Sequence, residues 1–355
     1  MSKPKGLGFG GFLIGIGAGW LIFRYITLTA DIAAWLLVIA GGAIIASSIL
    51  SYLSRGIPLT GMVSWLAVGM IIALLTTSGP AQFFSNNWVT GVYPYSTEAS
   101  MNFPGAATES TVLFSVENVN GQIEVDTWDR DEYNIDVTVK AKGTTEEDAQ
   151  DALEEVDVTM DDRITAGRRE LILTISVPRL TWRKISVSMA VTLPADATID
   201  LDLLTTNGNI KTSNIAGGDL SLQSTNGEVA FNHVYAPKIT SLTTNGRIRG
   251  HVEAGTLIAT TTNGQIDLTL PSTRSGSYTL SNTNGGIEVN IDPSENTGFD
   301  LDLRSTSGET TVDIEGLTYD TNTAKHKSAQ STGYASKTIQ IEVDASNTNG
   351  NVTVD

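Results

Sequence analysis

The chain begins with three apolar stretches separated by short polar breaks. They cover Leu7–Phe23, Ile32–Leu53 and Ile57–Thr76, and none of them contains an acidic or basic residue. A helix needs about 20 apolar residues to cross the ~30 Å hydrocarbon core of a bilayer. The pattern therefore predicts a three-helix transmembrane anchor over residues 1–84, in contact with lipid through residues 7–76. A cleaved signal peptide is the alternative for the first stretch, but no small-x-small cleavage site follows it.

After the anchor, apolar and polar residues alternate, and the motif Thr-Thr-Asn-Gly-x-Ile recurs. Its copies lie at 205–210, 224–229, 243–248, 261–266 and 282–287, with a degenerate copy at 305–310 and a last one at 347–352. The motif glycines from Gly208 to Gly308 are 19, 19, 18, 21 and 23 residues apart, and Gly350 follows after 42. A period of about 20 residues is the signature of a solenoid with one coil per repeat. We interpret the last gap as two coils with one corner lost.

Apolar residues also recur at fixed distances from each motif asparagine. The positions six and four residues before it hold pairs such as Leu201 and Leu203, and the third position after it holds residues such as Ile210. This alternation predicts half-buried strands on both sides of a corner. We therefore expect an all-β domain over residues 201–355, a parallel β-helix or β-solenoid. Because Asn-Gly is also the strongest signal for a two-residue hairpin, a meander of β-hairpins stays the alternative.

The motif indicates what holds neighbouring coils together. Thr precedes the asparagine or its Ser replacement in every copy, so stacked Thr side chains are expected to form hydrogen-bonded ladders. The Asn-Gly pair, for example at Gly246, is expected to supply the positive φ of a sharp corner. Unlike charges on neighbouring coils, Glu228 with Arg247 and Arg249 with Asp267, are expected to fix the register rather than to add much stability.

Residues 111–200 contain an outlying copy of the repeat at 114–125. Strands are expected at Tyr133–Lys140, Leu171–Val177 and Ile185–Leu193. A helix is expected after Thr144, which is followed three residues later by an acid. Because solenoids require caps, we expect this segment to hold the first coil and a helix-containing cap. Residues 85–110 are expected to be a stalk or linker.

Several of these motifs are shared with a known family. They are Val-Asn-Gly-Gln-Ile-Glu-Val-Asp-Thr-Trp-Asp at 119–129, the short helix, Val-Thr-Leu-Pro-Ala-Asp-Ala at 191–197 and the repeated Thr-Asn-Gly-x-Ile. Over about residues 112–355 the chain resembles the bacterial and archaeal putative-adhesin, β-strand-repeat domain of unknown function. The resemblance implies a β-helical cell-surface module with an adhesive or structural role, and it brings no catalytic residues.

Charge divides the chain at the same place as hydropathy. Residues 1–84 contain four basic residues and one acid and so carry +3, which leaves −20 of the total −17 for residues 85–355. The basic residues Lys3, Lys5 and Arg55 predict a cytoplasmic N-terminus and an extracellular C-terminal domain by the positive-inside rule. The acidic domain argues against nucleic acid as a partner, because phosphates need Lys and Arg.

The first apolar stretch carries a stripe of small residues. Gly11, Gly15 and Gly19 are spaced four apart, which lets helix backbones approach closely. The stripe predicts packing among the chain's own three helices or a homo-oligomer through this stretch.

Candidate chemistry is sparse. No metal is assigned, because the spacing of neither the histidines nor the two acidic runs matches a metal site, although weak calcium binding stays open. These residues are His233, His251 and His326, then Asp126, Asp129 and Asp131, and finally Asp157, Asp161 and Asp162. Because no nucleotide-binding or hydrolase motif is present, we predict no cofactor and no catalytic residue.

We therefore expect a multi-pass, membrane-anchored surface protein with a structural, adhesive or interaction role and an unidentified extracellular protein or polysaccharide partner. A polysaccharide-active enzyme is one alternative, because β-solenoids host such enzymes. Trp128 and Trp182, the tryptophans of the domain, both fall in the predicted cap and leave the coils without sugar platforms. The other alternative is an envelope-stress sensing component that works through a membrane partner.

Overall fold

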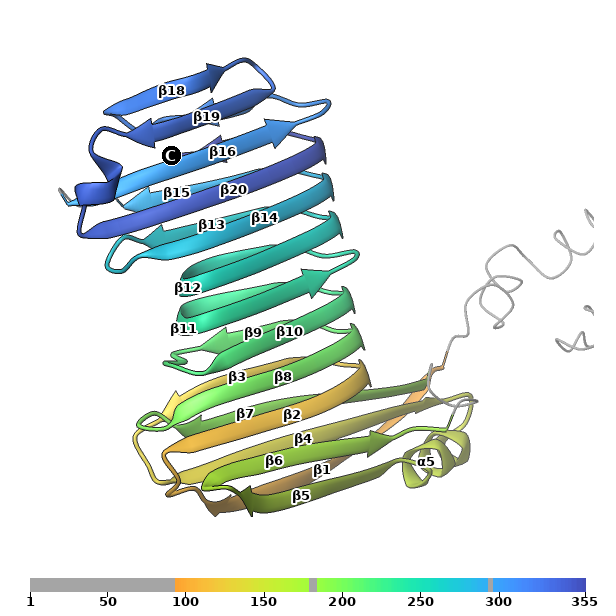
Figure 1. The fold of residues 1–355 in the computed structure, drawn as a ribbon. Helices are drawn as coiled ribbons and strands as arrows, with labels where there is room; N and C mark the ends of the chain where they lie inside the picture. The colour runs from red at the N-terminus through yellow and green to blue at the C-terminus, as the bar shows by residue number, and fades with distance from the viewer. Residues whose placement is uncertain (1–92, 179–183, 293–295) are drawn as a thin grey trace, which may run out of the picture. The chain divides into compact units, whose positions relative to one another are not determined.

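The computed structural model describes residues 93–178, 184–292 and 296–355. Pro94–Asp355 forms one compact unit, separate from Met1–Tyr93. Its described residues hold 21 strands joined in one sheet, together with one α-helix and one 3-10 helix (Figure 1). The predicted all-β class is therefore confirmed.

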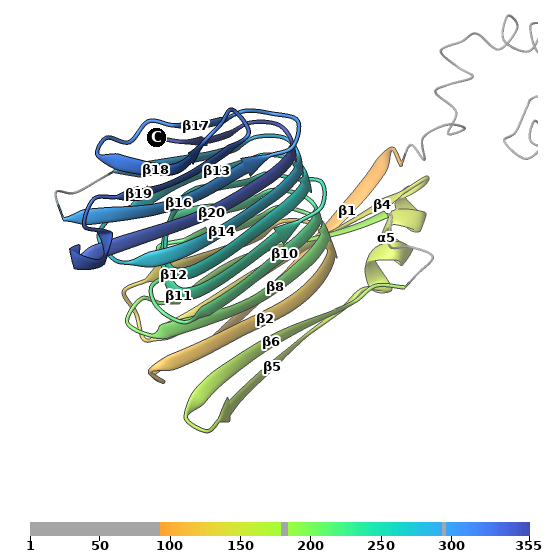
Figure 2. The same cartoon turned by 45° about the horizontal axis from the view of Figure 1, so that its top comes forward.

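The strands stack as rungs in two layers (Figure 2). The first layer contains β2 (Thr111–Asn120), β8 (Thr198–Asn207), β10 (Asp219–Asn226), β14 (Gly276–Asn284), β20 (Ile339–Asn349) and β16 (Thr297–Ser305). The second contains β3 (Ile123–Trp128), β9 (Ile210–Ser213), β13 (Ile266–Pro271), β15 (Ile287–Asp292), β21 (Val352–Val354) and β17 (Thr310–Val312). Two long strands, β11 (Val229–Thr243) and β12 (Ile248–Asn263), pass through both layers.

Neighbouring rungs pair in parallel and keep the repeat in register. Leu201 lies beside Leu220, and Ile248 lies beside Ile266, each pair at equivalent positions of two copies. A meander of hairpins would pair consecutive strands antiparallel instead. The parallel pairing is that of a solenoid-like fold.

The core fills the space between the two layers. The predicted inward columns are buried in every copy, including Ile239 and Ser241 of the third. Because side chains of a strand alternate between its faces, each rung places its apolar residues inside and its polar residues outside. The stack is thus held mainly by burial, with no disulfide available.

An asparagine ladder runs along one corner of the stack. The Nδ2 of each motif asparagine donates to the Oδ1 of the one a rung below, over 2.7–2.9 Å, through Asn120, Asn207, Asn226, Asn245, Asn263, Asn284 and Asn349. The predicted threonine ladder was assigned to the wrong residue, because the Thr before each asparagine is exposed. An amide can both donate and accept, which lets one column continue from rung to rung.

The motif glycines are required for a different reason from the predicted one. Gly246 does not have the positive φ that the sequence suggested; Gly285 and Gly350 do. A Cβ added to Gly246 would lie 1.8 Å from the carbonyl oxygen of Gly227 on the rung below. Glycine is needed here because successive corners stack backbone on backbone.

A second column of side-chain hydrogen bonds lies on the inner side of the same corner. The residue two places before the motif asparagine is buried and donates to the carbonyl of the glycine on the neighbouring rung: Ser224 to Gly208 (2.9 Å), Thr243 to Gly227 (3.0 Å), Thr261 to Gly246 (2.9 Å) and Asn282 to Gly264 (2.8 Å). These bonds satisfy carbonyls that the turn leaves without a strand partner.

The last rungs do not follow chain order, contrary to the interpretation of a lost corner. β20 lies between β14 and β16 and pairs in parallel with both. β21 likewise lies between β15 and β17. The C-terminal segment therefore supplies a complete rung between two coils that precede it in the chain (Figure 1).

A hairpin covers the outermost coil. β18 (Leu317–Asn322) pairs antiparallel with β19 (His326–Ser331), and β19 pairs antiparallel with β16. The 3-10 helix η2 (Tyr334–Ser336) then leads into β20.

The opposite end is a cap of antiparallel strands. It contains β1 (Tyr95–Ala106), β4 (Glu132–Gly143), β7 (Ile185–Pro194), β5 (Asp157–Thr165) and β6 (Arg168–Ser176). β4 lies between β1 and β7, and β6 joins β5 to β2. The strands expected in this segment are confirmed, but the linker prediction is wrong for Tyr95–Ala106, which forms β1.

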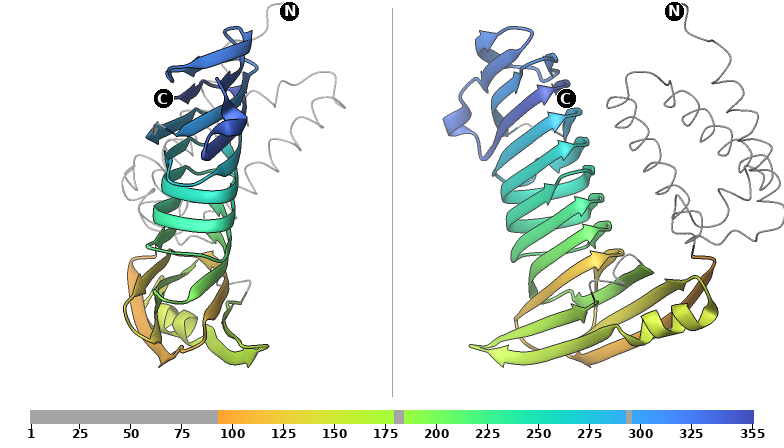
Figure 3. Two further views of the ribbon diagram at one scale, coloured as in Figure 1. Left: turned by 60° about the vertical axis from the view of Figure 1, so that its left-hand side comes forward. Right: turned by 90° about the vertical axis from the view of Figure 1, so that its right-hand side faces the viewer.

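The predicted helix is present as α5 (Glu146–Glu154), which packs on β4 and β1 (Figure 3). Its N-cap is Thr145 rather than Thr144: the Thr145 hydroxyl accepts from the Asp148 N–H over 3.0 Å. Asp148 in turn accepts from the Thr144 N–H over 2.7 Å. The capping pair is thus shifted by one residue, because both positions carry threonine and an acid follows each.

The three predicted membrane spans and the Gly11, Gly15 and Gly19 stripe lie outside the described residues. Among residues that the structure describes, no helix combines the length and apolar character needed to cross a bilayer.

Candidate functional site

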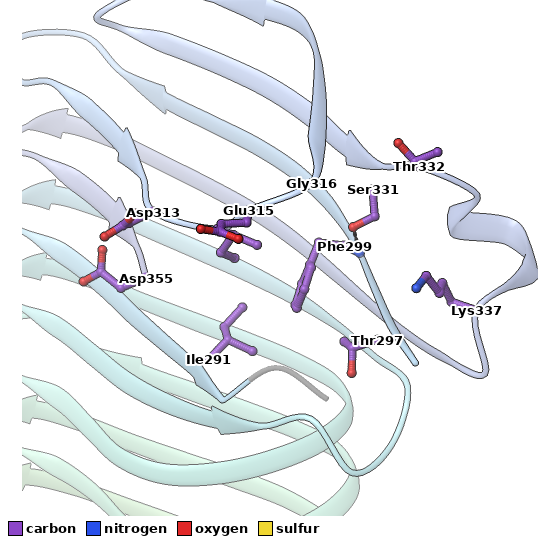
Figure 4. A pocket seen from close by; sticks show the side chains of 11 residues that line it. Ile291, Thr297, Phe299, Asp313, Glu315, Gly316, Ser331, Thr332, Lys337 and Asp355 are labelled. Carbon is purple, nitrogen blue, oxygen red and sulfur yellow. Dashed lines mark hydrogen bonds between the residues drawn. The ribbon is translucent and has the colours of Figure 1, made fainter. Parts of the chain in front are cut away.

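The candidate site is a pocket of about 610 Å³ beside the inserted rung. Figure 4 shows it between the ends of β15, β16 and β21 and the segment after β17. Ile291, Phe299 and Ile314 supply its apolar lining. The polar lining consists of Thr297, Asp313, Glu315, Ser331, Thr332, Lys337 and Asp355.

The polar groups of the pocket are divided in space. In Figure 4, Asp313, Glu315 and Asp355 lie on one side of the Phe299 ring, and Lys337 lies on the other. The Ser331 hydroxyl accepts from the Phe299 N–H over 2.9 Å, so it is committed to the backbone of β16. The lining offers charge, hydroxyl groups and an aromatic surface, a mixture that suits the binding of a ligand.

A cluster of ion pairs holds the β5–β6 hairpin to the segment between β1 and β2. Arg169 donates to Glu109 over 2.6 Å and to Asp162 over 2.7 Å. The hydrogen bond from Arg169 holds the pKa of Glu109 below its usual value. Burial and the hydrogen bond to Asp162 raise the pKa of Tyr133 to about 12. Each carboxylate of the cluster has the Arg169 guanidinium as a partner, as expected for a structural contact.

The two acidic runs have different surroundings. Asp161 and Asp162 are paired with Arg163 and Arg169. Asp126 accepts from the Asn214 side chain over 2.9 Å, which ties the first coil to its neighbour. Within the described ranges, no group of three or more acidic or histidine side chains is arranged to hold a metal ion.

The structure brings together two histidines that the sequence left unrelated. His233 and His251, on adjacent rungs of β11 and β12, have ring centroids 4.8 Å apart in a T-shaped arrangement. The ring Nε2 of His326 lies 3.0 Å from Asp302. His233 and His251 are 18 residues apart, which is one repeat, and this spacing could have revealed the histidine pair from the sequence.

The predicted charge pairing between rungs is partly wrong. Arg249, not Arg247, pairs with Glu228, over 2.8 Å. Arg249 is beside Asp267 in the register, as expected. A long guanidinium side chain reaches diagonally across the pleat, and this explains the shift. The half-exposed pair contributes about 0–1 kcal/mol.

The tryptophan in the described part of the cap is committed to structure. The Trp128 Nε1 donates to the Glu132 carbonyl over 2.7 Å, and Arg130 lies over its ring. Trp182 lies outside the described residues. Trp128 therefore anchors the turn between β3 and β4.

The model of the Toastrack DUF4097 family matches residues 113–355. The chain belongs to this family. The predicted resemblance is confirmed over the coils and the cap, and the family is one of unknown function.

Two solved structures are similar to most of this chain's length. A protein from Clostridium sporogenes described as a "putative cell adhesion protein" is 10% identical, with a TM-score of 0.33, and the match covers 73% of this chain and 99% of that one. A Bacteroides fragilis protein described as a "putative adhesin" is 10% identical, with a TM-score of 0.34 and coverage of 72% and 97%. No curated protein matches the chain.

Proposed function

We propose that this chain is a membrane-anchored cell-surface protein whose Toastrack domain is a structural or adhesive scaffold and performs no catalysis. The observation that carries the proposal is the contrast between the inside and the outside of the stack. The asparagine ladder and the buried columns are nearly constant from rung to rung. The outward column beside them changes freely.

That outward column follows each motif glycine. It holds Asn209, Glu228, Arg247, Gln265, Gly286 and Glu309. Catalysis needs acids and bases that converge on one point, whereas a scaffold needs only a regular backbone and a soluble exterior. The variation therefore supports a role in presenting surface rather than in turning over substrate.

The anchoring part of the proposal rests on the sequence. The three apolar stretches, the basic residues at their cytoplasmic ends and the −20 domain after them fit an extracellular domain on a membrane anchor. A strongly acidic exterior keeps such a domain soluble and away from anionic lipid.

The first experiment tests topology on intact cells that carry the full chain. Added protease should remove the domain after Phe84 and spare an N-terminal tag, as the charge asymmetry predicts. Lysed cells serve as the control in which both parts are digested. A domain that survives on intact cells, while being cut in lysates, would refute the surface location.

The second experiment tests the role itself. Cells with the chain should adhere better to surfaces and to one another than cells without it, and protease shaving should abolish the difference. The purified full chain should leave polysaccharide, peptide and ester substrates unchanged. Turnover that one acidic substitution abolishes would replace the scaffold with an enzyme.

A further inference from the structure

The inserted C-terminal rung is the feature that the scaffold role does not explain. β20 pairs with β14 on one side and with β16 on the other, both in parallel. Asn349 continues the ladder to Asn284 over 2.9 Å, and Ser305 of the coil above donates to the Gly350 carbonyl over 2.8 Å. The slot between the β14–β15 coil and the β16–β17 coil therefore binds this segment along both of its edges.

The path into the slot passes around a strand. β19 lies on the outer edge of β16 and β20 on its inner edge, so residues 332–338 cross from one side of β16 to the other. This crossing contains Gly333, with a φ of 71°, and the single turn η2. A short, tightly turned connection of this kind is a common hinge in domain swapping.

The two coils that border the slot are also suited to each other. β16 and β17 carry the same inward columns as β14 and β15, with Leu301 and Leu303 equivalent to Tyr278 and Leu280. Four residues separate Asp292 from Thr297, the same number that separates Pro271 from Gly276. The connection from Pro271 to Gly276 advances one rung, whereas the connection from Asp292 to Thr297 advances two, past β20. The length of the connection therefore does not indicate that a rung is inserted.

We propose that the β20–β21 segment is exchangeable and that a second copy of this chain takes it, so that two copies swap their C-terminal rungs. The same pairings and the same ladder bonds form whether the segment comes from its own chain or from another. The monomer and the swapped dimer then differ mainly in hinge conformation and in the entropy of association, which makes swapping a low-cost route to a dimer. The proposal does not depend on the adhesive role.

The test uses engineered cysteines, because the chain has none of its own. Ser281 on β14 and Ser346 on β20 are register partners on the outward face. Full-length chains with Ser281→Cys or Ser346→Cys alone are produced in the same cells, purified in detergent and oxidised. Swapping predicts a disulfide-linked dimer in which mass spectrometry finds the 281–346 linkage.

The matched control is the pair Thr260→Cys and Ser281→Cys. These residues are also register partners, on β12 and β14, but both belong to coils that follow chain order. They should give no linked dimer as single variants in two chains. The double variant Ser281→Cys/Ser346→Cys in one chain shows that this linkage can form at all.

The outcomes separate cleanly. A 281–346 dimer that exceeds the control supports exchange between copies. The linkage found only within single chains, or a dimer no more abundant than the 260–281 control, would overturn the proposal.

Discussion

Substitution of Gly246 by Ala tests how the corners are packed. The added Cβ would lie 1.8 Å from the Gly227 carbonyl oxygen, 2.6 Å from its carbon and 2.8 Å from the Thr243 hydroxyl. Close carbon–oxygen contacts normally stay near 3.3 Å, so the two rungs must separate locally by about 1.5 Å. The backbone carbonyl cannot move aside as a side-chain end could.

The cost has two parts. Forcing extra atoms into a packed site costs about 1–3 kcal/mol. Separation of these two rungs also weakens the side-chain bonds that join them, from Asn245 to Asn226 (2.8 Å) and from the Thr243 hydroxyl to the Gly227 carbonyl (3.0 Å). At about 1 kcal/mol for each bond, the total is roughly 3–5 kcal/mol.

The matched control is Gly167→Ala in the β5–β6 turn. Gly167 has a φ of 83° and nothing within 4 Å of an added Cβ, so this change introduces backbone strain without a clash. Such strain costs about 1–2 kcal/mol. The comparison therefore separates close packing from the positive φ that the Asn-Gly pair suggested.

Thermal unfolding of the full-length chain, followed by its far-UV strand signal, measures the difference. A loss of 3–5 kcal/mol should lower the Tm by roughly 6–20 °C, and the control should lower it by a few degrees. A Gly246→Ala variant that unfolds with the wild type, or no earlier than Gly167→Ala, would refute the stacking of backbone on backbone.

Three further predictions follow from the ladder and the cap. Asn245→Asp removes the amide that donates to Asn226 and should lower the unfolding free energy by about 1–3 kcal/mol. In the control Asn209→Asp, the side-chain oxygen still accepts from the Glu228 N–H, so the loss should be far smaller, and equal losses in the two variants would contradict a specific asparagine ladder. Arg169→Met leaves Glu109 without its cation and Asp162 with only the Tyr133 hydroxyl, and should destabilise by about 3–5 kcal/mol. Arg163→Met, at an exposed side chain, should lower the melting temperature far less, so equal melting temperatures of the two variants would refute a structural role for the cluster. The hydrogen bonds from Lys184 and Thr144 lower the pKa of Asp148 to about 2, so the ionised Asp148 stabilises the folded chain above the pKa that this group has in the unfolded chain, and this stability is lost as the pH falls. In acid titrations between about pH 5 and pH 2, Lys184→Met should make the fall in unfolding free energy shallower. An unchanged profile would show that the Asp148–Lys184 pair is not coupled to folding.

Much of the coil was predictable from the sequence because it depends on local pattern. Period-two alternation identified residues such as Leu203 and Ile210 as inward, and both are buried. The 20-residue period identified the rungs, since each coil must bury its apolar face against its neighbours. The apolar stretches at the N-terminus, and the membrane anchor they predict, rest on sequence alone.

Only the tertiary structure decided what depends on contacts between rungs. Asn245, and not Thr244, carries the ladder, because the turn directs the asparagine along the stack and leaves the threonine in solvent. Gly246 is needed for the carbonyl that lies beneath it rather than for its own φ. The C-terminal segment enters between two earlier coils because equivalent repeats present equivalent edges. A repeat pattern specifies that a rung fits its neighbours, but it does not specify which neighbours, and long-range pairing alone makes that choice.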